Sequence, residues 1–106
     1  MKRITSRAEF DKLRKHGRRT RTQYFDLVSC AIEKDADFGL AVIVSKKIGN
    51  AVKRNKIKRW IKNFAYTHAN LFRSNNDYLV ITKRGIYESG RNNIYNELER
   101  VLEEHE

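Results

Sequence analysis

Two almost unbroken apolar runs, FGLAVIVS at 38–45 and DYLVITK at 77–83, flank a long segment with a helical pattern. Apolar runs that do not alternate with polar residues are typical of strands buried on both faces, in the centre of a sheet. A helix between two such strands has to bury its apolar side against that sheet. The sequence therefore predicts a layered α/β domain built around a small sheet.

Shorter patterns fill in the first third of the chain. Ser6 and Glu9 have the spacing of a capping box and predict a helix over about 7–15, which ends at Gly17 in a left-handed conformation. The basic tract that follows is expected to be a loop or the entry to a strand. A run rich in β-formers predicts a strand at 24–32.

The remaining elements complete the fold prediction. A turn at 34–37 is expected to join the strands at 24–32 and 38–45 as a hairpin. An amphipathic helix with an acidic outer face is expected from about 89 to 104. The order α-β-β-(β)-α-β-α predicts an α/β (α+β) fold, a two-layer sandwich with helices on one face of a small mixed sheet.

The composition limits the class of protein. The 106 residues contain no Pro and no linker, so residues 1–106 are expected to form one domain. The single cysteine, Cys30, excludes a disulfide framework and a zinc site built on cysteines, and is expected to be a small buried apolar residue. No apolar stretch approaches the roughly 20 residues of a membrane span, and no signal peptide is recognisable. A cytoplasmic location is the default expectation.

Positive charge is concentrated between the two apolar runs. The net charge is +10, and residues 45–64 contain eight Lys or Arg and no acid. With Asn50 as the predicted N-cap, a helical arrangement of the following residues separates two sides. The apolar side carries Ile57, Trp60, Ile61, Phe64, His68, Leu71 and Phe72. The opposite side carries Asn55, Lys58, Arg59, Lys62 and Tyr66, with Arg54 and Lys56 at its flanks.

Different explanations of this basic side predict different residue patterns. A disordered tail would not keep the two sets of residues apart. A merely solvated helix face usually mixes Lys with Glu four residues apart, whereas residues 38–76 contain no carboxylate. Like charges four residues apart cost a few tenths of a kcal/mol for each pair. A phosphate-rich nucleic acid is the favoured partner, ahead of an acidic protein or a membrane surface.

The choice between RNA and DNA stays open on these grounds. No helix-turn-helix or zinc pattern accompanies the basic helix. Single-stranded nucleic acid requires aromatic rings beside a basic groove, and Phe10, Tyr24 and Phe25 lie near basic residues. Core packing is an equal alternative for these rings. Strand alternation sends Tyr24 and Phe25 to opposite faces of the sheet, so only one of the two is expected in the core.

The stretch SKKIGNAVKRNKIKRWIK at 45–62 resembles the signature region of the bacterial ribonuclease P protein subunit, which runs roughly Lys-Lys-x-Gly-x-Ala-Val-x-Arg-Asn. FDKLRKHG at 10–17 and DYLVITKR at 77–84 support the resemblance, which extends over nearly the whole chain. It implies a sandwich fold, also seen in a ribosomal small-subunit protein, with a left-handed crossover between two parallel strands. This crossover departs from the usual right-handed rule.

The resemblance also implies a function. In this family the protein binds the catalytic RNA of ribonuclease P, and the holoenzyme removes the 5′ leader from precursor tRNA. The RNA performs a hydrolysis that depends on metal ions, so Mg²⁺ is expected with the RNA subunit and no cofactor is expected on the protein alone. A monomeric protein within the ribonucleoprotein, and no membrane partner, are expected. The alternative is a structural RNA-binding protein of the ribosomal type on the same fold.

Residue by residue, the resemblance assigns RNA contacts to the basic stretch. Lys56 stands where the family more often has Arg, which keeps the charge but loses the planar fork. The leader is expected in a cleft between the first helix and the sheet, where Phe10, Arg14, Tyr24 and Phe25 are candidates. Arg14 replaces an aromatic residue that is usual there. The RNA-contact candidates are Lys46, Lys47, Asn50, Lys53, Arg54, Asn55, Lys56, Lys58, Arg59 and Lys62.

The residues give no support for catalysis by the protein itself. His16, His68 and His105 lack Cys or Glu partners at metal-ligand spacing, and a packing or capping role is favoured for His16. No nucleophile elbow or Walker-type phosphate loop is present. The acids at 26, 33, 35 and 37 are expected at edges and turns. No catalytic or metal-binding residue is therefore assigned.

Overall fold

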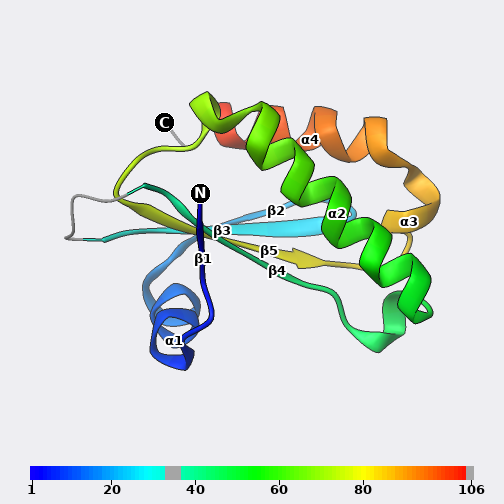
Figure 1. Cartoon of the computed structure of the whole chain (residues 1–106), viewed down its shortest axis with the longest axis horizontal. Helices are drawn as coiled ribbons and strands as arrows, with labels where there is room; N and C mark the ends of the chain where they lie inside the picture. Colours follow the sequence, from blue (N-terminus) through cyan, green and yellow to red (C-terminus); the bar gives the residue numbers. More distant parts are fainter. Residues whose placement is uncertain (33–36, 105–106) are drawn as a thin grey trace.

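The computed structural model describes residues 1–32 and 37–104, and shows a five-stranded mixed sheet with helices on both faces (Figure 1). The strands lie in the order β1-β4-β5-β3-β2. Most of the predicted turn at 34–37, and His105, lie outside the described residues. The elements are β1 (Lys2–Arg3), α1 (Arg7–His16), β2 (Arg18–Arg21), β3 (Phe25–Ala31), β4 (Gly39–Ile43), α2 (Ala51–Thr67), β5 (Asn76–Thr82), α3 (Ile86–Ser89) and α4 (Arg91–Glu104).

The two most apolar strands, β4 and β5, lie side by side and parallel, and α2 connects them. In Figure 1 both strands run from left to right, α2 lies above the sheet, and β4 lies nearer to the viewer than β5. This arrangement is a left-handed crossover, the reverse of the common hand. The small mixed sheet and the left-handed connection agree with the sequence prediction.

The predicted hairpin between the strands at 24–32 and 38–45 is wrong. β3 pairs antiparallel with β5 along its whole length, and β5 separates it from β4. The reason lies in burial, because β5 is apolar on both faces. Leu79 packs toward α1 and Val80 toward α2, and both are almost completely buried. A central position buries both faces of β5, and this outweighs the preference for pairing strands that are neighbours in sequence.

The sequence predicted that the helices lie on one face of the sheet, and this prediction is wrong. α2, α3 and α4 cover the upper face in Figure 1, whereas α1 lies below the sheet. Successive side chains of a strand point to opposite faces of the sheet, so the same strands contribute to the core on both faces. Leu27 and Val80 join the large core under α2 and α4, while Leu13 of α1 packs with Val28 and Leu79 in a smaller core on the opposite face. The first helix is therefore a third layer.

The ends of α1 differ from the predicted ones in their chemistry. Ser6 occupies the N-cap position, but its side chain makes no capping hydrogen bond, and Glu9 pairs instead with Lys2 at 3.3 Å. Gly17 is extended, with φ −75° and ψ 150°, so the predicted left-handed stop is wrong. A Cβ at Gly17 would lie 2.4 Å from the carbonyl oxygen of Leu13 and from Val28. Glycine is required here by close packing.

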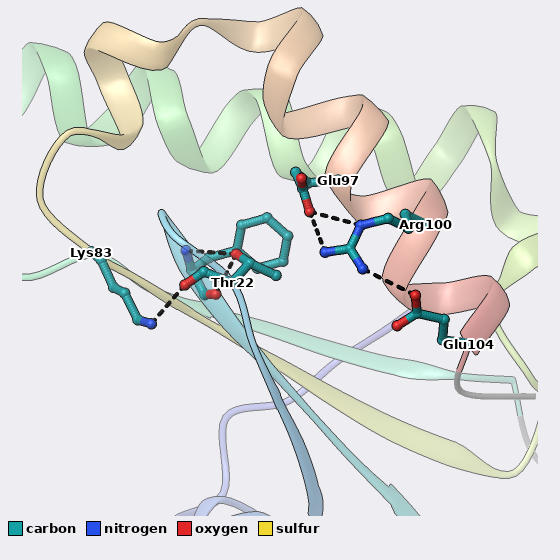
Figure 2. Close-up of polar contacts among 6 residues, drawn as sticks. Thr22, Lys83, Glu97, Arg100 and Glu104 are labelled. Atoms are coloured by element: carbon teal, nitrogen blue, oxygen red, sulfur yellow. Dashed lines mark hydrogen bonds and ion pairs between the residues drawn. The ribbon is translucent and has the colours of Figure 1, made fainter.

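The predicted last helix, about 89 to 104, is confirmed as α4, and the short α3 before it was not predicted. Gly90 separates the two helices with a positive φ of 89°, a conformation that favours glycine. On the outer side of α4, Arg100 donates to Glu97 at 2.6 Å and to Glu104 at 3.0 Å, as Figure 2 shows. The acidic face of α4 is thus partly neutralised within the helix itself.

The basic tract after Gly17 forms β2, which pairs with β3 and brings a buried carboxylate into an ion-pair cluster. Asp26 was expected at an edge or turn, but it lies within β3 and is only 3% exposed. Arg19 and Lys83 each approach its carboxylate to 2.6 Å. Lys83 also donates to the carbonyl oxygen of Thr22 (Figure 2). The cluster ties together β2, β3 and the end of β5.

Replacing Asp26 by Asn is expected to lower the free energy of unfolding by about 2 kcal/mol at pH 7. Removing one partner of a fully buried ion pair normally costs more than this. Here Arg19 and Lys83 are 46% and 37% exposed, so water screens their charges. Urea unfolding of the variant and the wild type would measure the difference. Asp11→Asn, the same change at an exposed position of α1, is the control and is expected to cost less than about 0.5 kcal/mol.

The effect of Asp26 should also depend on pH. Burial is the largest single influence on its pKa and opposes ionisation, but the hydrogen bonds and charges of Lys83 and Arg19 together hold the pKa below the ordinary 3.8. Such a carboxyl contributes stability above pH 3.8 and loses it as the pH falls through the lower folded-state value. The difference between wild type and Asp26→Asn should therefore shrink in acid. A difference that stays constant from pH 7 to pH 2 would contradict this account.

Candidate nucleic-acid interface

The segment between β4 and α2 positions the first cations. A short 3-10 turn, Lys46–Ile48, follows the end of β4, and the buried Ile48 anchors it while both lysines point to solvent. Asn50 then caps α2, since its side-chain oxygen accepts a hydrogen bond from the backbone N–H of Lys53 at 3.0 Å. The predicted N-cap is confirmed. This cap marks the start of α2 and satisfies one of the backbone N–H groups that the first turn of a helix leaves without a partner.

The apolar side of α2 packs on the sheet and on α4. Ile57, Ile61 and Phe64 are at most 1% exposed, as predicted. Trp60 is half-buried: its ring stacks on Tyr87 at 5.7 Å. The helix ends at Thr67, so the predicted Leu71 and Phe72 lie beyond it, although Phe72 is buried in the same core.

His68 follows the last residue of α2 and is half-buried, at the edge of the core where the sequence placed it. Its ring stacks on Phe64 with 4.3 Å between centroids, and its Nε2 lies 3.2 Å from a carboxylate oxygen of Glu99. These contacts join the end of α2 to α4. They give His68 a packing role.

The side of α2 that faces away from the sheet, its flanks and the preceding turn carry eight cations and two asparagines, called here the basic face. None of its ten members is buried, and within residues 1–32 and 37–104 none forms an ion pair with a carboxylate. Arg100 of α4, by contrast, has two carboxylate partners. The exposed members are Lys46, Lys47, Asn50, Asn55, Lys58 and Arg59, and the half-buried ones are Lys53, Arg54, Lys56 and Lys62.

Two of these lysines lean toward the neighbouring helix. The ammonium of Lys53 lies 5.1 Å from the ring centroid of Tyr87 in α3, and that of Lys56 lies 5.8 Å from the same centroid and 5.9 Å from that of Trp60. Cation–π contacts of this kind orient an ammonium without neutralising it. Both lysines therefore form the flank of the basic face on the α3 side, where the sequence placed Lys56.

The four leader-cleft candidates are not brought together. Phe10 and Arg14 belong to α1 below the sheet, where Phe10 is half-buried and Arg14 is exposed. Phe25 is 1% exposed in the upper core, so its ring has no face to offer a base, and this candidate is wrong. Tyr24 is half-buried against that same core. It lies before β3 begins, so the strand alternation that was expected to separate the two rings does not apply.

A groove at the β1–β4 edge of the sheet was missed by the sequence reasoning. It has a volume of about 470 Å³ and joins residues of α1 and α2. Tyr66 had been placed on the outer side of α2, but no role was assigned to it. The missed signal is an aromatic ring on the polar side of a helix, among cations. The groove is lined by Met1, Arg3, Ile4, Thr5, Phe10, Leu40, Ala41, Val42, Lys58, Lys62 and Tyr66.

The described ranges contain neither a metal-ligating cluster nor a membrane-spanning helix. Residues 1–32 and 37–104 hold no group of three or more His, Cys, Asp or Glu side chains that could ligate a metal ion. Cys30 is half-buried beside the smaller core, less enclosed than expected. No helix in the same ranges combines the length and the apolar character needed to cross a bilayer.

Proteins of a known family resemble this chain in sequence over most of its length. A family model described as Ribonuclease P matches residues 1–106. A ribonuclease P protein component from Syntrophus aciditrophicus is 42% identical over 82 residues, which cover 76% of this chain and 67% of that protein. The corresponding protein from Staphylococcus aureus is 36% identical over 101 residues, 94% of this chain and 86% of the relative.

Solved structures of RNase P proteins have the same fold as this chain. The Staphylococcus aureus RNase P protein superposes with a TM-score of 0.90 at 33% identity, covering 100% of this chain and 96% of that one. The RNase P protein of Thermotoga maritima has the same fold, with a TM-score of 0.84 at 24% identity and 96% of each chain covered. These findings favour the ribonuclease P reading over the ribosomal alternative. The chain belongs to the family of ribonuclease P protein components, subunits of the ribonucleoprotein endoribonuclease that processes tRNA.

Proposed function

We propose that the basic face binds the catalytic RNA of ribonuclease P. The observation that carries this proposal is that the cations of the turn and of α2 have no carboxylate partner among the described residues, although the chain elsewhere pairs Arg19, Lys83 and Arg100 with acids. Phosphates supply the missing negative charge, and their condensed counterions are released on binding. The ten candidate residues keep the RNA-contact role that the sequence predicted for them.

The second part of the proposal concerns the substrate. The 5′ leader of precursor tRNA binds next to α1, where Phe10 and the exposed Arg14 are the remaining candidates on the lower layer. A guanidinium plane can stack on a base as an aromatic ring does, so Arg14 can replace the ring that the family usually has there. Tyr24 lies on the other layer and is a weaker candidate.

In this proposal the two subunits have different roles. The RNA subunit performs the phosphodiester hydrolysis with bound Mg²⁺, as the resemblance implies, and no hydrolytic step is assigned to the protein. The protein acts as one copy in a cytoplasmic ribonucleoprotein, and by covering phosphates it lowers the repulsion between RNA subunit and substrate.

Reconstitution tests this proposal. Cleavage of precursor tRNA by the cognate ribonuclease P RNA would be measured at low Mg²⁺, with and without the full chain. We expect cleavage to rise by at least about tenfold, since phosphate neutralisation by several cations is worth more than 1.4 kcal/mol. Bovine serum albumin replaces the protein in the control. No stimulation by a folded protein that still binds the RNA would refute the proposed role in precursor-tRNA cleavage, and loss of RNA binding by the folded protein would refute the proposed interface.

A further inference from the structure

The groove at the β1–β4 edge connects the two layers of the molecule. In Figure 1 the N-terminal segment passes in front of the sheet, from the level of α2 down to α1. Both helices contribute to the groove around this edge: Phe10 comes from α1, and Lys58, Lys62 and Tyr66 come from α2. The groove is therefore continuous with the basic face.

The lining of the groove combines three kinds of surface. Its apolar part comes from Ile4, Leu40 and Val42 at the sheet edge, and its charged part from Arg3, Lys58 and Lys62. Within the described ranges none of these three cations pairs with a carboxylate. The volume of about 470 Å³ falls in the range of roughly 300–1,000 Å³ that is typical of small-ligand sites.

Tyr66 is the unusual member of this lining. Its side chain is 68% exposed, and among the described residues only Val52 is a comparably exposed large apolar side chain. Tyr66 lies one helical turn after Lys62 and two turns after Lys58, so the three side chains share one side of α2. An exposed ring between cations and an apolar wall matches the requirements of a stacked base with its phosphates.

We propose that this groove binds an unpaired RNA nucleotide, with its base stacked on the ring of Tyr66 and its flanking phosphates held by Lys58, Lys62 and Arg3. The base must be unpaired because both faces of a base within a duplex are already covered by its neighbours. An acidic peptide would satisfy the cations but would leave the ring and the apolar wall without a matching partner. The inference rests on the proposed RNA binding by the basic face.

The test uses the full chain and a single-stranded RNA octamer with 2-aminopurine at a central position. Stacking of this base on an aromatic ring quenches its fluorescence. Tyr66→Ala is expected to weaken binding about tenfold and to abolish the quenching, since one stacked base is worth about 1–3 kcal/mol. Tyr66→Phe keeps the ring and should bind within about twofold of the wild type. Lys62→Gln should weaken binding and reduce its salt dependence while the quenching at saturation persists.

The outcomes separate this inference from the function on which it rests. If Tyr66→Ala leaves affinity and quenching unchanged while Lys62→Gln weakens binding, the RNA is held by charge alone and the inference is wrong. If neither Lys62→Gln nor Lys58→Gln affects binding, RNA binding by the basic face is itself wrong. Equal quenching by the same sequence in a duplex would overturn the requirement for an unpaired base. Displacement of the octamer from the wild type by polyglutamate as effectively as by unlabelled RNA would favour an acidic peptide instead.

Discussion

Replacing Lys58 and Arg59 by alanine is expected to weaken binding of the ribonuclease P RNA by about 10- to 100-fold at physiological salt. Both side chains are exposed on the basic face, and neither has a carboxylate partner among the residues that the structure describes. Each is expected to neutralise one phosphate. The slope of log affinity against log salt should therefore become shallower by about two. A double variant that includes Arg54 is a poorer test of RNA binding, because Arg54 is half-buried.

The matched control removes the same charge from another helix. Arg91→Ala with Arg100→Ala also lowers the net charge by two, but in α4, where Arg100 is bound to Glu97 and Glu104. Filter binding or fluorescence anisotropy at several salt concentrations would compare the two double variants. The control is expected to change affinity by less than about threefold. Equal losses in both would show that net charge, and not the basic face, governs binding.

Replacing Phe64 by alanine is expected to lower the free energy of unfolding by about 4 kcal/mol. Phe64 is 0% exposed, and its ring contacts His68, Phe72 and Tyr95 with centroid distances of 4.3, 6.2 and 5.1 Å. Truncation of such a ring removes apolar burial and leaves a cavity, at a typical cost of 3–5 kcal/mol. Since small domains are stable by only about 5–15 kcal/mol, a large share of the stability would be lost.

Thermal and urea unfolding followed by circular dichroism would measure this loss, and the melting temperature is expected to fall by about 20 °C. Tyr66→Ala on the same helix is the control, because its ring is 68% exposed and should contribute less than about 0.5 kcal/mol. The contrast tests the rotation of α2 directly. A loss below 1 kcal/mol for Phe64→Ala would mean that the apolar side of α2 does not face the sheet.

The correct predictions rest on residues that lie close together in the sequence. The cap at Asn50 and the burial of Ile57 and Phe64 follow from helical spacing, and the structure confirms them. Helical periodicity is a property of a single segment, so it can be recognised without knowledge of the fold. The same holds for the exposed side of α2, where Lys58 and Arg59 lie as predicted.

The wrong predictions concern contacts between distant segments. β5 separates β3 from β4, and no local pattern in 24–45 contains this information. Phe25 and Tyr24 pack against the same core because Tyr24 precedes the strand. Position 17 requires glycine because Val28 lies too close to leave room for a Cβ, and this contact forms only in the folded chain. The groove is likewise formed by α1, α2 and the sheet edge together, so its lining could not be assembled from spacing alone.

The contrast between α2 and α4 has a consequence for how RNA approaches. The two helices lie over the same face of the sheet (Figure 1), and α2 has six basic residues and no acid, whereas α4 has four Glu and two Arg. This layer therefore has an electric dipole across it. A polyanion is therefore expected to be attracted by α2 and repelled by α4, which favours one orientation at the first encounter. This orienting effect should fade with added salt.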